Sequence, residues 1–219
     1  MKFNVGEWVL KPGVSTHNCE QIRQVVLNED KTLLHLYAVT YRADYRGLDG
    51  PSLEVDITAP QPGILRTRIT HFRGSRAKMP AFELNDAACK MDVQETDEEI
   101  CVSSGDLTLK IGKRPCYFRY FWQGKKITSV GDRFGSPMLS YLSTNDGPFM
   151  RGQLEIGVGE KVYGMGERFT AFVKNGQVVD IWNEDGGTSS ELAYKNIPFY
   201  ITNRGYGVLV NDPGPVSFE

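Results

Sequence analysis

The strongest constraint on the fold is a long succession of short runs rich in β-branched and aromatic residues, each closed by Gly, Pro, Asn or Asp. The clearest run is 52–59, where Leu53, Val55 and Ile57 alternate with polar residues. Alternation with period 2 is typical of a strand that buries one face and exposes the other. Many such strands with almost no helical pattern predict an all-β fold, a two-sheet antiparallel β-sandwich.

The other predicted strands follow the same pattern of apolar runs between turn residues. They cover 21–27, 32–40, 64–72, 90–93, 99–103, 107–112, 117–123, 153–157, 161–164, 167–174, 177–182, 197–203 and 206–211. Hairpin loops are expected at 104–106 and 123–126, because each follows one of these runs and contains a glycine. Residues 132–149 lose the pattern and are predicted to form a surface excursion.

Two local signals make sharper predictions. Asn175-Gly176 stands between two apolar runs and predicts a type I′ hairpin, in which both turn residues take positive φ. Thr188-Ser189-Ser190-Glu191 fits a capping box, which predicts a helix of about two turns through Tyr194.

Composition narrows the possible partners. The 219 residues include 25 basic and 27 acidic side chains, for a net charge of -2, without a basic stripe or polybasic cluster. This balance argues against nucleic acid and membrane surfaces as partners. There is no long apolar run typical of a membrane span or a secretory signal, and no Asn-x-Ser/Thr acceptor. The expected location is therefore cytoplasmic.

No metal or cofactor motif survives inspection. The glycines at 157 and 159 call for a third at 162, which is Val162, and no helix follows to hold a dinucleotide. Cys19, Cys89, Cys101 and Cys116 form no C-x-x-C pair, so we expect reduced thiols packed as small apolar groups. A disulfide between Cys89 and Cys101 is the less favoured alternative.

One loop combines residues that suit sugar binding. Asp185 precedes two glycines that leave its carboxylate open, and Trp182 offers a flat apolar face of the kind that packs on sugar rings. Asp185 and Trp182 are therefore the candidate substrate-binding residues. The alternative from the same residues is an Asp that caps a turn beside a core Trp.

The last third of the chain resembles the N-terminal β-sandwich of family 31 glycoside hydrolases, in their bacterial α-xylosidase branch. The similarity rests on V-Y-G-M-G-E-R-F at Val162–Phe169, I-W-N-E-D-G-G-T at Ile181–Thr188, Y-K-N-I-P-F-Y at Tyr194–Tyr200 and N-R-G-Y-G-V-L-V at Asn203–Val210. The first 150 residues match only in general pattern.

This resemblance implies a galactose-mutarotase-like supersandwich over 1–219, truncated at its C-terminal end, from a larger retaining α-glycosidase. Such an enzyme hydrolyses α-linked xylosyl or glucosyl residues in a (β/α)8 barrel that is absent from this chain. The resemblance implies no catalytic residue here and no cofactor. Its expected partners are the catalytic barrel of its own chain and an oligosaccharide. In the family an Asp of the loop, here Asp185, contacts sugar hydroxyls, while the preceding Arg of the family is replaced by Glu184.

Other interpretations stay open at this point. The runner-up is a stand-alone carbohydrate-binding sandwich, and a third is a mutarotase-like enzyme that uses His71 with a glutamate. If a barrel normally covers this domain, its loss leaves an apolar patch, for which Phe199-Tyr200, Tyr206 and Phe218 are candidates. Such a patch predicts self-association, so a homo-oligomer is a further possible partner.

Overall fold

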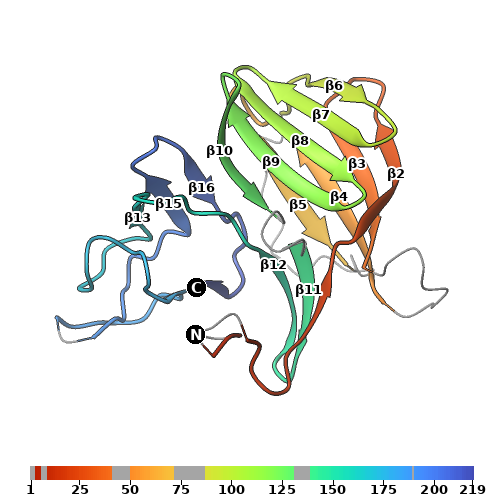
Figure 1. The fold of residues 1–219 in the computed structure, drawn as a ribbon. Helices are drawn as coiled ribbons and strands as arrows, with labels where there is room; N and C mark the ends of the chain where they lie inside the picture. The colour runs from red at the N-terminus through yellow and green to blue at the C-terminus, as the bar shows by residue number, and fades with distance from the viewer. Residues whose placement is uncertain (1–2, 6–8, 41–49, 72–86, 131–138, 189) are drawn as a thin grey trace. The chain divides into compact units, whose positions relative to one another are not determined.

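The computed structural model describes residues 3–5, 9–40, 50–71, 87–130, 139–188 and 190–219 (Figure 1). Strands are the only regular elements among these residues, and their pairs are antiparallel. The chain divides into two compact units, a sandwich unit of residues 13–155 and a C-terminal unit of residues 156–219 with 1–12. Whether both belong to one domain over 1–219 stays a prediction.

The described residues of the sandwich unit form twelve strands in three sheets. One sheet has the order β2-β3-β4-β5, the second β10-β9-β8-β7-β6 and the third β1-β11-β12. Their bounds are β1 (Ser15–Asn18), β2 (Gln21–Leu27), β3 (Leu33–Val39), β4 (Ser52–Thr58), β5 (Arg66–Thr70), β6 (Asp92–Glu95), β7 (Glu99–Ser104), β8 (Leu107–Lys113), β9 (Cys116–Trp122), β10 (Lys125–Val130), β11 (Leu139–Thr144) and β12 (Gly147–Gly152).

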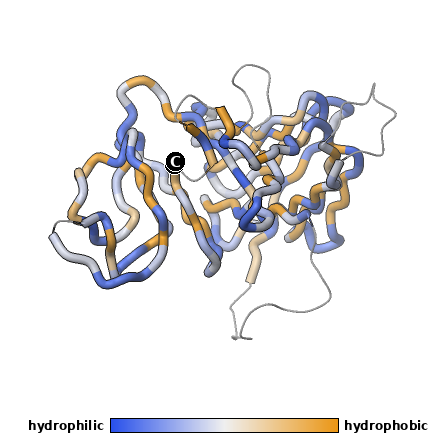
Figure 2. The backbone as a smooth tube through the Cα atoms, turned by 90° about the horizontal axis from the view of Figure 1, so that it is seen from below, coloured by the Kyte–Doolittle hydropathy of each residue, from blue (hydrophilic) through white to orange (hydrophobic). Residues whose placement is uncertain are grey.

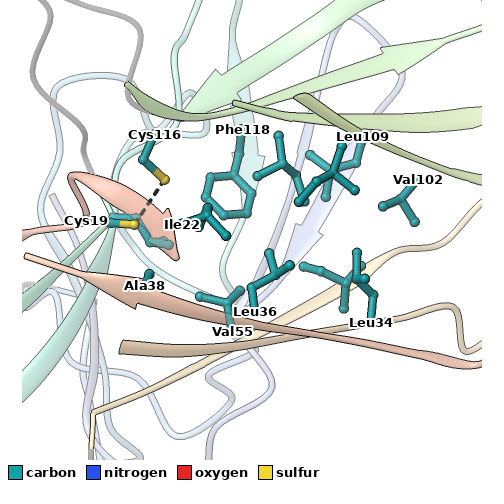
Figure 3. Close-up of a cluster of buried hydrophobic side chains, with 14 of the residues drawn as sticks. Cys19, Ile22, Leu34, Leu36, Ala38, Val55, Val102, Leu109, Cys116 and Phe118 are labelled. Carbon is teal, nitrogen blue, oxygen red and sulfur yellow. Dashed lines mark hydrogen bonds between the residues drawn. The ribbon is translucent and has the colours of Figure 1, made fainter. Parts of the chain in front are cut away.

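The core of this unit lies between the four-stranded and five-stranded sheets. Leu34 and Leu36 of β3 meet Leu109 of β8 and Phe118 of β9, all at most 2% exposed (Figure 3). Hydrophobic and hydrophilic residues are interspersed along the chain (Figure 2), and in β4 buried residues alternate with more exposed ones. Burying a side chain of this size stabilises the fold by roughly 1.5–3 kcal/mol, so this layer dominates the stability of the unit.

The C-terminal unit is built from shorter strands. They are β13 (Val162–Gly164), β14 (Val179–Ile181), β15 (Phe199–Thr202), β16 (Gly207–Leu209) and β17 (Val216–Phe218). The sheet orders are β13-β15-β16 and β14-β17. The first residues of the chain join this unit, because the Phe3 amide and the Asn4 side chain donate to the Glu219 carboxylate at 3.0 and 3.2 Å.

The all-β prediction and most predicted strands are confirmed. The hairpins at 104–106 and 123–126 are also confirmed, as β7–β8 and β9–β10. Gln123 and Gly124 have φ values of 47° and 78°, so the type I′ conformation occurs in the second of these turns. Residues 139–144 and 147–152 correct the predicted surface excursion, because they pair as β11 and β12. Residues 131–138, and Phe72 at the end of another predicted strand, lie outside the described residues.

The type I′ hairpin predicted at Asn175-Gly176 is wrong. Only Gly176 takes a positive φ, 74°, and the turn closes with the Gln177 amide on the Lys174 carbonyl at 3.0 Å. The Asn175 side chain instead accepts from the Val162 amide at 2.9 Å and donates to the Glu160 carbonyl at 3.0 Å. Residues 167–174 form no strand, so no paired strand precedes the turn.

The helix predicted to follow Thr188 is also wrong. Ser189 lies outside the described residues, and around it Ser190 and Thr188 lie in a turn while Ala193 bridges Asn183 in parallel. That bridge uses the Ala193 carbonyl as acceptor for the Glu184 amide at 3.0 Å, so an extended pairing replaces the helical one. No helix in the described residues is long and apolar enough to cross a membrane.

Candidate functional site

The loop that follows β14 carries both candidate sugar-binding residues. Trp182 is 61% exposed, so the interpretation of this residue as a core Trp is wrong. Asp185 is exposed two residues after Asn183, and within the described residues its carboxylate has no hydrogen bond or ion pair. A side chain at Gly187 would meet open space. The loop therefore presents an indole face and a carboxylate to the solvent.

Asn196 anchors both ends of this loop. Its side-chain Nδ2 donates to the Trp182 carbonyl at 2.7 Å and to the Ala193 carbonyl at 2.6 Å. Asn183 Oδ1 lies 3.0 Å from the same nitrogen, whose two hydrogens are shared among the three acceptors, and the Asn196 backbone amide donates to that oxygen at 3.2 Å. One amide side chain therefore ties the start of the loop to its return segment, which limits the freedom of Trp182.

The guanidinium of Arg168 binds the side-chain oxygen of Asn196. Its Nη2 donates to Asn196 Oδ1 and, at 2.7 Å, to the Asp180 carbonyl. Its Nη1 donates to the Glu191 carbonyl at 2.9 Å. Burial lowers the pKa of the guanidinium, while the charge of Asp180 opposes that shift. Arginine suits this position because its planar fork offers five donors and no acceptor, and each acceptor here is a carbonyl oxygen.

Glycines bring the supporting segments close together. Gly166 has φ +89°, and a Cβ on it would lie 2.0 Å from the Lys195 carbonyl oxygen. A Cβ on Gly186 would lie 2.2 Å from the Leu192 carbonyl oxygen. Gly164 and Met165 also take positive φ, at 111° and 68°, so the chain turns sharply before Arg168. The Y-G-M-G-E-R motif thus places the Arg168 guanidinium under the loop.

The sequence does not single out Arg168 or Asn196. Each stands only within a family motif, Arg168 in Val162–Phe169 and Asn196 in Tyr194–Tyr200. The sequence signal for such a role is an Arg or Asn close to glycine-rich turns. Tight turns leave backbone carbonyls without a partner, and these side chains can donate hydrogen bonds to them.

The histidine alternative gains no support from the geometry. His71 Nδ1 lies 2.9 Å from the Ser52 carbonyl oxygen, which is an acceptor, and its ring lies 4.6 Å from the Tyr141 ring. Within the described residues His71 forms no hydrogen bond or ion pair with a glutamate. No group of three His, Cys, Asp or Glu gathers as metal ligands in the described part of the chain.

The cysteines are all free thiols, which agrees with the predicted reduced state. The sequence pairing considered, Cys89 with Cys101, is not formed. The structure instead brings together Cys19 and Cys116, with their sulfur atoms 3.0 Å apart in the sandwich core (Figure 3). The two cysteines are 97 residues apart in the chain, so no local sequence pattern predicts their contact.

Comparison with known proteins identifies a family and two relatives of known activity. The model of the glycosyl hydrolase 31 N-terminal galactose mutarotase-like domain matches residues 54–219. An α-xylosidase of Emericella nidulans is 38% identical over all of this chain, which spans 30% of that protein. The α-xylosidase XylQ of Lactiplantibacillus pentosus is 35% identical over all of this chain, which spans 28% of it.

Solved structures show the same fold. The cycloalternan-forming enzyme of Listeria monocytogenes, solved with a pentasaccharide substrate, superimposes with a TM-score of 0.68 at 20% identity. The match covers 90% of this chain and 18% of that enzyme. The chain therefore spans less than a third of the length of each of these relatives.

Proposed function

Because this chain belongs to the glycosyl hydrolase 31 N-terminal galactose mutarotase-like domain family, we propose that it is the N-terminal domain of a retaining α-xylosidase. The parent enzyme hydrolyses α-linked xylosyl residues, with α-linked glucosyl residues as the neighbouring substrate class. The observation that carries the proposal is the 38% identity to an α-xylosidase over the whole chain.

Catalysis belongs to the part of the parent that lies outside these residues. A retaining glycosidase needs two carboxyl groups held roughly 5–5.5 Å apart. In a (β/α)8 barrel such groups lie at the C-terminal mouth of the strands. Glu184 and Asp185 are both exposed, but adjacent side chains on one glycine loop do not provide a pair held apart on opposite sides of a sugar. The role of the loop that carries Asp185 is to line the entrance of the active site and to bind the sugar. The isolated chain should therefore not hydrolyse aryl α-xylosides.

The loop suits this binding role for two reasons. The Asp185 carboxylate is free to accept a hydroxyl hydrogen bond, and Trp182 offers an exposed apolar face to a sugar ring. Asn196 and Arg168 hold the base of the loop, so less conformational entropy is lost when sugar binds. Preorganisation of this kind distinguishes a contact loop from a passive surface turn.

The catalytic domain of the same chain is the partner we propose for the exposed face of the β13-β15-β16 sheet. Phe199, Ile201 and Leu209 are 38%, 45% and 58% exposed, and Phe199 pairs with Leu209 across β15 and β16. Tyr163 pairs with Ile201 on the neighbouring strand. Contiguous apolar surface of this kind usually meets a partner.

The patch differs in part from the one expected from sequence. Tyr200 is only 7% exposed and lies on the opposite face of the sheet, where its ring meets Phe218 at 6.0 Å. Leu209→Glu should reduce self-association and hydrophobic-dye binding by the isolated chain. Val158→Glu is the matched control, because Val158 is fully exposed outside this sheet. Equal behaviour of both variants would contradict the docking proposal.

The sugar contact is tested in the full-length parent by Asp185→Ala. A hydrogen bond to a charged group is worth roughly 1.5–3 kcal/mol, so kcat/KM should fall about 10- to 150-fold. The thermal melt should not change. Asp97→Ala, on an exposed turn of the sandwich, is the matched control and should leave kcat/KM unchanged. Unchanged kinetics in Asp185→Ala would make the loop structural only.

Trp182→Ala should also keep the fold, because the side chain is exposed. If Trp182 stacks on sugar, the loss of a large aromatic contact should weaken binding by about 10-fold or more. A fall in thermal stability without a change in KM would contradict the stacking role.

A stand-alone carbohydrate-binding module remains the second candidate, favoured by the exposure of Trp182 in the isolated chain. Isothermal titration with xylose and isoprimeverose separates the two. Micromolar affinity of the isolated chain, lost in Trp182→Ala, would support the module. Binding only in the full-length parent would support the proposal that this domain lines the active site of the catalytic barrel.

A further inference from the structure

Two buried cysteines meet between the two main sheets of the sandwich. Cys19 directly follows β1 and lies two residues before β2 of the four-stranded sheet, and Cys116 is the first residue of β9 in the five-stranded sheet. Their sulfur atoms lie 3.0 Å apart, and the two residues are 0% and 1% exposed (Figure 3). The contact joins positions 97 residues apart in the chain.

Backbone hydrogen bonds hold the two cysteines in place. The Cys116 amide donates to the carbonyl of Glu20, the neighbour of Cys19, at 3.2 Å. The Cys19 amide donates to the Leu139 carbonyl at 2.7 Å. Both thiols are therefore fixed in apposition by the fold itself, and a covalent bond requires an approach of only about 1 Å more.

We propose that Cys19 and Cys116 form a disulfide bond when the chain folds under oxidising conditions, and that this bond links the connection between β1 and β2 to β9 of the five-stranded sheet. The cross-link would close a loop of about 100 residues, and a loop of this length gives a large reduction in the entropy of the unfolded chain. Such a bond adds a covalent link between layers that pack mainly through apolar contacts.

The reaction is thiol–disulfide exchange with a small-molecule disulfide as oxidant. One cysteine loses its proton and attacks a sulfur of the oxidant, which releases one thiol and leaves a mixed disulfide. The second cysteine then loses its proton and attacks the protein sulfur of that mixed disulfide, which forms the Cys19–Cys116 bond and releases the second thiol. The two cysteines lose two electrons and two protons, and the oxidant becomes two thiols.

The folded state should protect the reduced pair. The hydrogen bond with Cys19 and burial together raise the pKa of the Cys116 thiol well above its ordinary value. Little thiolate is therefore present, and an oxidant molecule cannot reach buried sulfur. Oxidation should accordingly occur during folding or on transient opening, and the finished bond should then resist reduction for the same reason.

The other two cysteines provide an internal control. Cys101 lies on β7, where its register partners are Gln94 and Lys110 rather than a cysteine. Cys89 contacts the Pro60 carbonyl, with its sulfur 4.0 Å from that oxygen. The double variant Cys89→Ser/Cys101→Ser leaves the proposed pair as the only thiols in the chain.

The experiment refolds this double variant from urea with oxidised or reduced glutathione and measures intact mass, non-reducing peptide maps and thermal melts. We expect a mass loss of two hydrogen atoms, a linked peptide pair containing Cys19 and Cys116, and a rise in Tm of about 10 °C. Native protein should form the same bond at least 10-fold more slowly without urea.

Variants keep the outcome interpretable. Cys19→Ala in the same background should retain the fold at lower stability and show no oxidant-dependent rise in Tm. If that variant does not fold, the mass and peptide map of the parent double variant still decide the proposal. A protein that refolds with both thiols free in oxidised glutathione would overturn it. A bond that forms but lowers Tm would equally overturn the role of the bond as a link between the sheets.

Discussion

The sandwich unit and the C-terminal unit achieve order in different ways. The sandwich has strands of four to seven residues and a continuous apolar core with many fully buried side chains. The C-terminal unit has strands of three or four residues and exposes Phe169, Phe172 and Trp182 at 63%, 79% and 61%. Its loops are instead tied by polar side chains, chiefly Arg168 and Asn196.

This difference separates stability from recognition. Apolar burial is non-directional and scales with area, so it suits a scaffold. Hydrogen bonds from a fixed side chain are directional and hold a loop in one geometry while its aromatic residues stay exposed. In the C-terminal unit the motif residues Arg168 and Asn196 therefore support the loop, while Trp182 stays exposed between them.

The largest expected effect on stability comes from comparing a buried phenylalanine of the sandwich unit with an exposed one of the C-terminal unit. Phe118→Ala removes a ring that is 2% exposed and should lower the free energy of unfolding by about 3–5 kcal/mol. Phe172→Ala removes a ring that is 79% exposed and should change it by at most about 0.5 kcal/mol. Urea unfolding measures both. Equal losses would abolish the distinction between the units.

A smaller effect tests the close packing of the C-terminal unit. Gly166→Ala should destabilise the protein by more than about 2 kcal/mol, because the positive φ is costly and the new Cβ collides with the Lys195 carbonyl. Gly176→Ala is the matched control, since its φ is also positive but nothing lies within 4 Å of the new atom. The two thermal melts should differ, and identical shifts would show that the collision is relieved.

The sequence predicted the sandwich better than the C-terminal unit because long alternating strands carry their own evidence. β4 was predicted from its apolar periodicity, and its burial follows the same alternation. β2 was predicted from its apolar run, and an irregularity in its pairing between Ile22 and Gln24 interrupts the alternation of burial. β11 and β12 were missed because Gly147, Pro148 and Gly152 resemble a loop, although tertiary pairing makes them strands. The Cys19–Cys116 contact depends on how two sheets stack, which no local pattern reports.

The turn type predicted from residue types was wrong where a side chain forms hydrogen bonds outside the turn. Asn175 was expected to adopt positive φ in a hairpin, but its amide is needed between Val162 and Glu160. Gln123 adopts that conformation instead, although its residue type favours it less. For the candidate site, the sequence predicts Trp182 and Asp185 as sugar-binding residues, and their role stays a prediction. The exposure of Trp182 and the roles of Arg168 and Asn196 could not be predicted, because they depend on distant carbonyls.

A local effect is expected when the anchor of the loop is removed. Asn196→Ala deletes the donor to the Trp182 and Ala193 carbonyls, which should lower the opening free energy of the loop by about 1–2 kcal/mol. Hydrogen exchange at the Glu184 amide, which donates to Ala193, should accelerate roughly 5- to 30-fold. Lys195→Ala is the control, because its ion pair with Glu167 is exposed and contributes little.

The smallest expected effect is a difference in the alkaline response of the two units. In the sandwich, burial raises the pKa of Tyr120 above its ordinary value of 10.0, and its hydroxyl lies 3.2 Å from Thr67 Oγ1. The folded state therefore holds this proton more tightly than the unfolded state. The resulting stability is fully present below pH 10 and is lost as pH rises from there through the raised pKa.

Lys174 in the C-terminal unit has the opposite sign. Burial and, secondarily, the charge of Arg168 lower the pKa of its amine below the ordinary value of 10.5, so the folded state releases this proton first. Stability should rise as pH increases from the lowered pKa toward 10.5. In urea unfolding between pH 8 and 11, Tyr120→Phe should flatten the alkaline loss, and Lys174→Met should steepen it. Parallel pH profiles for both variants and the unmodified chain would show that neither group titrates differently on folding, and the electrostatic contrast between the units would then be wrong.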